Sequence, residues 1–374
     1  MRAADVLILG GGGAGTAAAL FLARAGQRVI LLERGLIGGQ ASGVNHGGVR
    51  QQGRTAAELP LAMRARALWG QMRALVGTDA EFDPCGHLRL ARTPDGEAKL
   101  VAWAALAAGY GLKPRLMGGN AIRSAYPLGE SVIAGSLLAE DGTANPRLLA
   151  PAFAAAARAA GAALLEDQSV AELHHDGARF RLRANGAPFA APILLNTAGF
   201  WGGRIAESFG EPVPVVAIQP NMQVTEPLPH MLGPNLGVAD GTLYLRQIAR
   251  GNVIFGGGRG IAWADATRTR PAVAAGDATR ALVMELLPWL RGAMIIRNWT
   301  GTDGEMPDGQ PVLGPSLTRP GLFHAFGFSG HGFALGPAVG QVLAELVVQG
   351  RTDVDLAPFA INRFNQDGNG AISG

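Results

Sequence analysis

Three glycines near the start of the chain have the spacing needed to hold a phosphorylated ligand. Gly10, Gly12 and Gly15 form a G-x-G-x-x-G pattern between an apolar run at 5–9 and a helical pattern at about 14–25. The first glycine permits a tight turn, the second lets a pyrophosphate approach the backbone, and the third lets the helix pack on the strand. The free N–H groups and positive dipole at the start of the helix would then face the phosphates.

A carboxylate lies where it would bind the sugar of such a ligand. Glu33 ends a second apolar run, 28–32, about 20 residues beyond the glycines, which is where an acid bonds the ribose hydroxyls of a dinucleotide. Its charge would repel a 2′-phosphate. The order of strand, helix, strand and acid therefore predicts a site for FAD or NAD, but not for NADP.

A run of small residues, GLIGGQASGVNHGGVRQQGR at 35–54, directly follows the second strand. Such a run can lie along the middle of an extended dinucleotide. We expect Ser42 and the amides of 40–43 to serve the pyrophosphate, and 45–48 to reach the ring end.

The bulk composition limits the other classes of function. A length of 374 residues suggests two domains, and the net charge of +3 comes from scattered arginines, so we expect no nucleic-acid binding. Cys85 is the only cysteine, which excludes an intrachain disulfide or a cysteine metal cluster and fits a reducing, cytoplasmic location. We expect no metal, no signal peptide and no transmembrane segment, because the apolar N-terminal run is broken by glycines and the C-terminal helical pattern by Gln341 and Glu345.

Five further motifs carry a resemblance to a known family. They are SGVNHGGVRQQ, DGTANPRLL, NTAGFWGG, MPDGQPVLG and GFSGHGFALGP. Their order resembles that of the amine-oxidising flavoproteins that include D-amino acid oxidase, glycine oxidase and sarcosine oxidase, over nearly the whole chain. The resemblance is closest to the β subunits of heteromeric opine, hydroxyproline or proline, and sarcosine dehydrogenases.

This resemblance implies non-covalent FAD, with an FMN shared with a partner subunit as a further expectation. It implies that Val170 contacts the adenine through its backbone and that Gly199 and Trp201 lie along the cofactor. Together with the glycine patterns it gives the following expected cofactor-binding residues: Gly10, Gly12, Gly13, Ala14, Gly15, Glu33, Arg34, Gln40, Ala41, Ser42, Asn45, His46, Gly47, Val170, Ala198, Gly199, Trp201, Gly330, His331, Gly332 and Phe333.

The glycine-rich turn at 327–332 follows the apolar run GLFHAF and precedes a helical pattern from about 333 to 348. The resemblance implies that this turn faces the isoalloxazine. N–H groups placed there would stabilise the negative charge of the reduced ring. His331 would tune reduction or orient substrate, or else serve only as a helix cap or loop contact. Arg50 matches the position of an arginine near the flavin, with a surface salt bridge as its alternative.

The chain also departs from the family pattern. Where relatives place an arginine that grips the substrate carboxylate, WTGTDGEMPDGQP offers Asp303 and Glu305. Either another arginine such as Arg246 substitutes, or these acids meet a cationic group of the substrate, or both are solvated loop residues. Covalent flavin is not expected, because Cys85 is far from the attachment region and Asn145 replaces a histidine.

Electron transfer to oxygen is also put in doubt. The lysine that activates oxygen in monomeric sarcosine oxidases has no counterpart, since no lysine follows Lys113. We therefore expect a dehydrogenase that oxidises a C–N bond of an amino acid or secondary amine and passes electrons to a partner subunit. The alternative is a self-sufficient oxidase in which Arg259 or His331 replaces the lysine. Two alternatives from other functional classes are an NAD-dependent dehydrogenase and a scaffold subunit that holds flavin but has no active site of its own.

The expected architecture is α/β, with a Rossmann-like FAD-binding domain made of 1–85, 145–210 and 300–374. A second, mainly antiparallel α+β substrate domain, 86–144 and 211–299, should roof the flavin. Alternation along its strands puts Tyr244 and Arg246 on one face, and Asn221 and Gln223 on one face. We expect these four side chains to line the pocket, with His331, Arg50, Tyr244 and Arg246 as the candidate catalytic residues.

Overall fold

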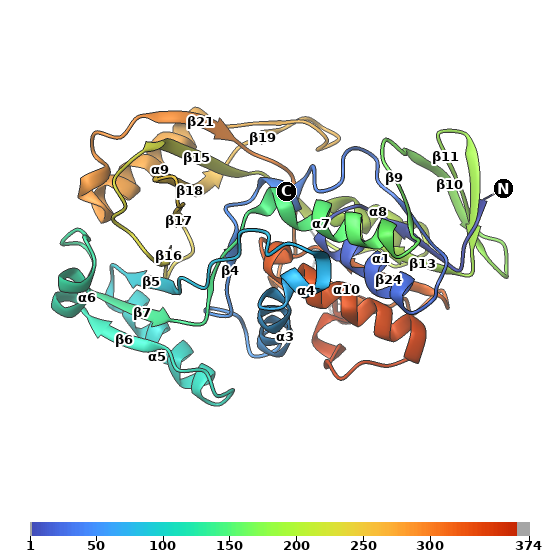
Figure 1. The fold of residues 1–374 in the computed structure, drawn as a ribbon, viewed down its shortest axis with the longest axis horizontal. Helices are drawn as coiled ribbons and strands as arrows, with labels where there is room; N and C mark the ends of the chain where they lie inside the picture. Colours follow the sequence, from blue (N-terminus) through green and yellow to red (C-terminus); the bar gives the residue numbers. More distant parts are fainter. Residues whose placement is uncertain (1, 365–374) are drawn as a thin grey trace.

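The computed structural model describes residues 2–364. The chain builds two parts, each around its own sheet, and crosses between them several times (Figure 1).

The first part is built on a six-stranded sheet in the order β23-β24-β13-β2-β3-β9. Every neighbouring pair is parallel except β23 with β24. Its strands are short and almost wholly apolar, as expected where both faces of a sheet are covered. They are β2 (Val6–Leu9), β3 (Val29–Leu32), β9 (Ala163–Leu165), β13 (Ile193–Asn196), β23 (Val312–Pro315) and β24 (Leu322–Phe326).

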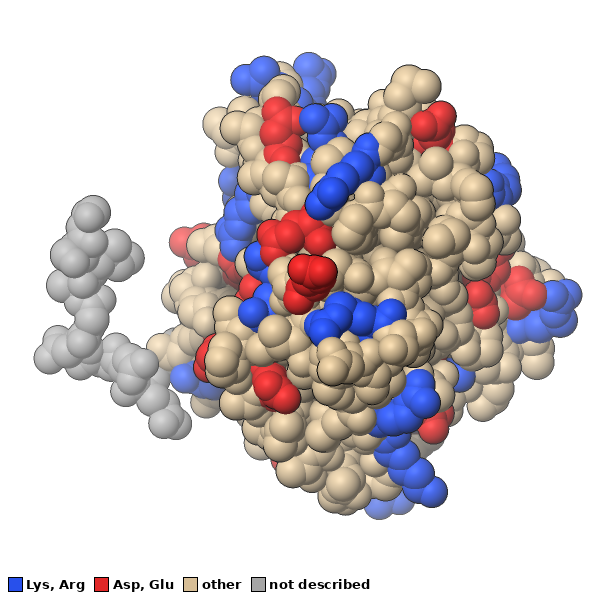
Figure 2. Space-filling model, turned by 90° about the vertical axis from the view of Figure 1, so that its left-hand side faces the viewer, with Lys and Arg blue, Asp and Glu red and all other residues tan. Residues whose placement is uncertain are grey.

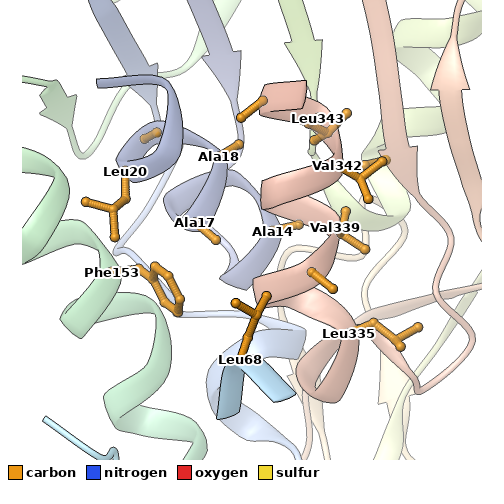
Figure 3. Close-up of a cluster of buried hydrophobic side chains, with 14 of the residues drawn as sticks. Ala14, Ala17, Ala18, Leu20, Leu68, Phe153, Leu335, Val339, Val342 and Leu343 are labelled. Carbon is orange, nitrogen blue, oxygen red and sulfur yellow. The ribbon is translucent and has the colours of Figure 1, made fainter. Parts of the chain in front are cut away.

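Three helices pack on one face of this sheet, and α1 lies between the other two (Figure 3). They are α1 (Gly13–Arg24), α7 (Pro146–Ala159) and α10 (Gly332–Gln349), and α3 (Leu59–Trp69) packs on α10. Small residues permit the close approach of α1 and α10, since a Cβ at Gly340 would collide with the backbone of Ala18. The other face is covered by a small sheet of β1 (Arg2–Ala3), β12 (Ala187–Ala191), β11 (Phe180–Ala184) and β10 (Val170–His175).

The second part is an eight-stranded sheet in the order β21-β15-β18-β17-β16-β5-β7-β6, antiparallel except for β16 with β5. Its strands are β5 (His87–Ala91), β6 (Arg115–Gly118), β7 (Ala134–Leu138), β15 (Pro220–Pro227), β16 (Asn235–Val238), β17 (Tyr244–Gln247), β18 (Asn252–Arg259) and β21 (Ile295–Trp299). Helices α5 (Pro94–Ala108), α6 (Gly119–Ala125) and α9 (Val273–Leu286) pack around it.

Short elements complete the described chain. The helical ones are α2 (Ala41–Val44), α4 (Met72–Val76), α8 (Gly202–Ser208) and the 3₁₀ turns η1 (Gly199–Trp201), η2 (Pro288–Leu290), η3 (Ala357–Phe359) and η4 (Ile361–Phe364). The strand pairs are β4 (Gly48–Val49) with β8 (Gly142–Thr143), β14 (Val216–Ile218) with β22 (Asp303–Glu305), and β19 (Ile261–Ala262) with β20 (Thr269–Arg270).

The predicted fold class is confirmed: a Rossmann-like α/β part is joined to a mainly antiparallel α+β part. The six-stranded sheet takes no strand from 86–144 or 211–299, and the eight-stranded sheet takes all of its strands from those ranges. The division of the chain into domains at those boundaries stays a proposal, which this distribution supports. Of the range 300–374, residues 365–374 lie outside the described residues.

Helix α10 is long and apolar enough to cross a membrane by length and composition alone, but 67% of it is buried inside the protein. Its contacts with α1 and α3 make it a core helix of the first part. At the end of the molecule formed by the eight-stranded sheet, acidic and basic side chains are intermixed over the surface (Figure 2).

Candidate active site

One cavity of about 1140 Å³ runs between the two parts. That volume exceeds the roughly 300–1,000 Å³ of a pocket for one drug-sized ligand. Its floor is formed by the turn after β2, the segment 40–48, η1 and the turn before α10; its roof is formed by residues of β15, β16, β17, β18 and β5. The cavity therefore has room for a dinucleotide and a second, smaller molecule.

The first glycine turn has the form that its sequence predicted. Gly10 has φ +108, and a Cβ there would collide with the backbone of Thr197. Ser42 Oγ accepts a hydrogen bond of 2.9 Å from the Gly13 amide. Within residues 2–364, the amides of Gly12 and Ala14 donate to no protein acceptor. They lie at the cavity wall, as required for groups that would hold a pyrophosphate.

Glu33 lies at the same wall, and its carboxylate is fixed by the backbone. Its Oε2 accepts a hydrogen bond of 2.7 Å from Gly11 N, and its Oε1 one of 2.8 Å from Gly35 N. Each carboxylate oxygen keeps a further lone pair for a ribose hydroxyl. The residues present thus fit FAD at this end of the cavity.

Most of the predicted cofactor residues lie on the cavity wall. Those that line it are Gly10, Gly12, Gly13, Ala14, Glu33, Arg34, Gln40, Ala41, Ser42, Asn45, His46, Val170, Ala198, Gly199, Trp201, Gly330, His331, Gly332 and Phe333. Gly15 and Gly47 do not. A Cβ at Gly15 would collide with the Gly10 carbonyl, and one at Gly47 with the Ala144 carbonyl, so both glycines permit close backbone packing behind the wall.

Two predictions for the roof are wrong. Asn221 and Gln223 share a face of β15, but it is the face toward α9: Asn221 donates to the Ala272 carbonyl, and Gln223 Nε2 lies beside Gly276. Met222, between them, lines the cavity instead. Arg246 is also behind the wall, buried and donating to the Ala144 carbonyl at 2.8 Å, while Tyr244 of the same strand lines the cavity.

The second glycine turn presents a histidine whose partner was not predicted. His331 occupies the N-cap position of α10, but its side chain makes no capping bond. Its Nδ1 lies 2.8 Å from Oε1 of Glu58, a side chain that is completely buried. The side chain is therefore held by a buried carboxylate beside the cavity rather than serving as a cap.

The protonation states of this pair follow from their surroundings. Burial, the repulsion of Arg54 and an offsetting attraction from Glu58 bring the pKa of His331 to about 4. Burial alone would raise the pKa of Glu58, but Arg54 and His331 lower it to about 2. At neutral pH His331 is thus uncharged, donates its Nδ1–H to the Glu58 carboxylate, and leaves Nε2 as an acceptor.

Arg50 lies on the cavity wall and makes no surface salt bridge within the described residues. It donates to the carbonyl of Gln52. Burial, together with the nearby cations Arg54 and Arg89, lowers the pKa of its guanidinium. Its position is that of a cation facing the cavity, and its place near the flavin stays a prediction.

His46 and Tyr244 lie against each other across the cavity wall, with ring centroids 4.5 Å apart. Burial and the cations Arg246 and Arg50 lower the pKa of His46 to about 3, so this imidazole is neutral at neutral pH. Burial, and then the charge of Asp303, raises the pKa of Tyr244, which stays a phenol. The pair therefore offers neutral hydrogen-bonding groups.

Asp303 and Glu305, the two acids in the motif that departs from the family pattern, lie in different surroundings. Asp303 lines the cavity and accepts hydrogen bonds of 2.8 Å from the amides of Gly304 and Gly330. Burial nevertheless raises the pKa of Asp303 to about 6. Glu305 instead forms an ion pair of 2.7 Å with Arg259.

Sequence reasoning missed Glu58, Arg54 and Arg89. Arg54 and Glu58 are spaced i, i+4 and both fully or almost fully buried, with 3.6 Å between Nη1 and Oε2. Arg89 interrupts the apolar strand HLRLA. A charged residue inside an apolar strand was the one local signal available for it.

One cavity joins the dinucleotide-binding turn to a polar pocket under the mainly antiparallel sheet. This arrangement is that of a dinucleotide-dependent oxidoreductase. Residues 5–346 match the family described as DAO, FAD dependent oxidoreductase, and the chain belongs to this family. The FAD prediction is thereby confirmed, as is the prediction of an oxidoreductase.

Individual relatives are similar over the whole chain. Glycine oxidase of Geobacillus kaustophilus is 30% identical in sequence, and the alignment covers 96% of this chain and 97% of that protein. The crystal structure of glycine oxidase from Geobacillus kaustophilus superimposes with a TM-score of 0.88 and covers 97% of this chain and 99% of that one. The structure of L-proline dehydrogenase from P. horikoshii is 26% identical, with a TM-score of 0.89 and 98% of each chain covered. Mouse mitochondrial sarcosine dehydrogenase is 26% identical over 97% of this chain, which spans 41% of that longer protein.

Proposed function

We propose that the protein oxidises the C–N bond of an amino acid or secondary amine, of the opine, hydroxyproline, proline or sarcosine type, as the catalytic β subunit of a heteromeric dehydrogenase. The observation that carries this proposal is the single cavity lined both by the dinucleotide clamp and by the polar groups Tyr244, Asp303 and His331. The names of the relatives, glycine oxidase and L-proline dehydrogenase among them, support the substrate class.

FAD, when bound, supplies the acceptor for the hydride that leaves the carbon bearing the amine. The residues of the chain bind and orient the amine and exclude water from it. Neutral His331, with Nε2 unoccupied and Nδ1 fixed by Glu58, is suited to accept an N–H of the substrate. Asp303 is suited to hold a cationic nitrogen above about pH 6, where its carboxylate is ionised.

The electron acceptor is proposed to be a partner subunit, through a shared FMN or another cofactor. The chain has only two lysines, Lys99 and Lys113, and both are exposed at or after α5, away from the cavity. The cavity therefore lacks an ammonium group of the kind that would promote reaction with oxygen. A cytoplasmic location, supported by the single unpaired cysteine, belongs to the same proposal.

A self-sufficient oxidase that reduces O₂ to H₂O₂ is the second candidate. It is favoured by the end-to-end match to a glycine oxidase and by the cation Arg259 at the cavity wall, one of the two residues expected to replace the lysine. The other, His331, also lines the cavity but is neutral at neutral pH.

Stopped-flow absorbance separates the two candidates. The purified FAD-bound chain is mixed without oxygen with a panel of secondary amino acids, opines and prolines, and the amine that bleaches the flavin band is identified. The bleached protein is then mixed with air-saturated buffer. A dehydrogenase subunit reoxidises much more slowly than it is bleached and turns over with an artificial dye; reoxidation in air as fast as bleaching, in a monomer, would establish the oxidase instead.

A further inference from the structure

Arg89 extends from the roof to the floor of the cavity. It belongs to β5, and its guanidinium donates from Nε to the Val238 carbonyl at 3.4 Å and from Nη2 to the Ala239 carbonyl at 3.0 Å. On the floor it meets Gly53, which has φ +78 and where a Cβ would lie 3.0 Å from Cζ of Arg89. The glycine thus makes room for a guanidinium that two carbonyls hold in place.

Two further arginines face the same point. Arg50 Nη1 lies 3.3 Å from the Cβ position of Gly53. Arg54, 3% exposed, lines the cavity, and within the described residues its Nη1 has no hydrogen-bond partner. Burial lowers the pKa of all three guanidinium groups, so holding three positive charges here costs free energy.

The acidic side chains around the three arginines do not balance their positive charge. Glu58 lies 3.6 Å from Arg54 and is already bonded to His331. The oxygens of Asp141, whose pKa burial raises to about 6, already accept hydrogen bonds from the backbone amides of Gln51 and Gln52 and from the Gln51 side chain. Asp240 is exposed near Arg89. Inside the described part of the chain, Nη1 of Arg89 makes no hydrogen bond. The group that best complements the wall formed by these arginines is therefore an anion.

We propose that Arg89, with Arg50 beside it, binds the carboxylate of the substrate. The inference rests on the proposed function and deepens it by assigning the residues that bind the carboxylate shared by amino acid, opine, proline and sarcosine substrates. Two other arginines at the cavity have partners: Arg259 is paired with Glu305, and Arg34 lies 4.2 Å from the centroid of the Trp201 ring. A planar guanidinium fixed on one side presents its remaining N–H groups to both oxygens of a carboxylate. Arg89 thereby takes the role left open by the acids at 303 and 305.

The test uses a carboxylate that cannot be oxidised at a C–N bond, together with its neutral analogue. Cyclopentanecarboxylate and cyclopentanecarboxamide are titrated into the FAD-bound protein by calorimetry. The wild-type protein should prefer the carboxylate. Arg89→Gln should weaken carboxylate binding by roughly tenfold to a hundredfold, the range expected for a hydrogen bond between charged groups, and should change carboxamide binding less than twofold. The matched control Arg259→Gln, another cavity arginine, should keep the preference.

Arg89→Lys is the second variant, for use if Arg89→Gln does not fold. It keeps the positive charge but removes the two-pronged guanidinium, so it should retain part of the preference for the carboxylate. The inference is overturned if the wild-type protein binds both probes equally, if the Arg89 variants lose both probes equally, or if Arg259→Gln loses as much as Arg89→Gln. Since neither probe is a substrate amine, failure of every amine to bleach the flavin would sink the proposed function and leave the carboxylate result to be judged separately.

Discussion

The floor and the roof of the cavity are built in different ways. The floor presents backbone amides and small residues, such as Gly12, Ala14 and Gly330, whose positions are fixed by tight turns and helix starts. The roof presents side chains, Met222, Tyr244 and Arg89 among them, from strands of one mainly antiparallel sheet. A site made of backbone suits a constant ligand, the cofactor, whereas a site made of side chains can be altered residue by residue to suit a substrate.

The largest effect is expected where the floor depends on the absence of a side chain. Gly15→Val places a Cβ against the Gly10 carbonyl and within 2.6 Å of Thr197 Oγ1. Such overpacking should cost about 3 kcal/mol of unfolding free energy, the upper end of the usual range, and abolish FAD retention. Thermal unfolding and the flavin content after dialysis measure both. Gly118→Ala, which meets nothing within 4 Å, is the control, and a Gly15→Val protein that stays yellow would contradict the packing argument.

His331, in the floor, is expected to act on the substrate through its side chain. His331→Gln should slow bleaching by substrate about a hundredfold, in line with the contribution of a positioned proton acceptor, while FAD affinity changes little. Because the pKa of His331 is lowered to about 4, the imidazole is neutral above that pH. Its contribution to the rate should be lost as the pH drops through about 4, below the separate change near pH 6 expected from Asp303.

A matched control for this histidine exists in the core. His324 is likewise bonded to a carboxylate, that of Glu211 at 3.1 Å, but it is fully buried and does not line the cavity. His324→Gln should lower thermal stability and leave the bleaching rate nearly unchanged. Equal losses of rate and FAD affinity in His331→Gln would make His331 a structural residue.

A smaller effect is expected at the ribose end of the floor. Glu33→Ala removes a charge-assisted contact worth about 1.5 to 3 kcal/mol, so FAD affinity should fall roughly tenfold to a hundredfold. Equilibrium dialysis or fluorescence titration of the apoprotein measures it. Glu166 also accepts a backbone amide, that of Ile37 at 2.7 Å, but lies off the cavity wall. Glu166→Ala should therefore retain FAD, and unchanged retention in Glu33→Ala would refute the clamp.

The sequence predicted the floor far better than the roof, for a physical reason. A glycine turn, a helix start and a terminal acid lie within one βαβ unit, so local pattern suffices to place Gly10, Gly12 and Glu33. One face of β15 packs on α9 and the other faces the cavity. The polar residues Asn221 and Gln223 lie on the α9 face, so their polarity did not identify the face that meets the ligand.

Two of the missed contacts join parts of the chain that are far apart in sequence. His331 and Glu58 are 273 positions apart, and Arg89 meets Gly53 through packing of roof on floor rather than through any shared motif. The resemblance to a family supplied the flavin and the position of the second turn, but not these partners. Pairings of this kind depend on how the two sheets dock, which no local periodicity records.

The packing of α1 against α10 also governs how the protein can be made. Helix α1 emerges early from the ribosome, whereas the helix that covers its small-residue face ends at Gln349. At about 5–20 residues per second, the nascent chain carries that uncovered face for roughly 15 to 60 s. During translation the cofactor clamp is therefore incomplete, and FAD can be captured firmly only after α10 has docked.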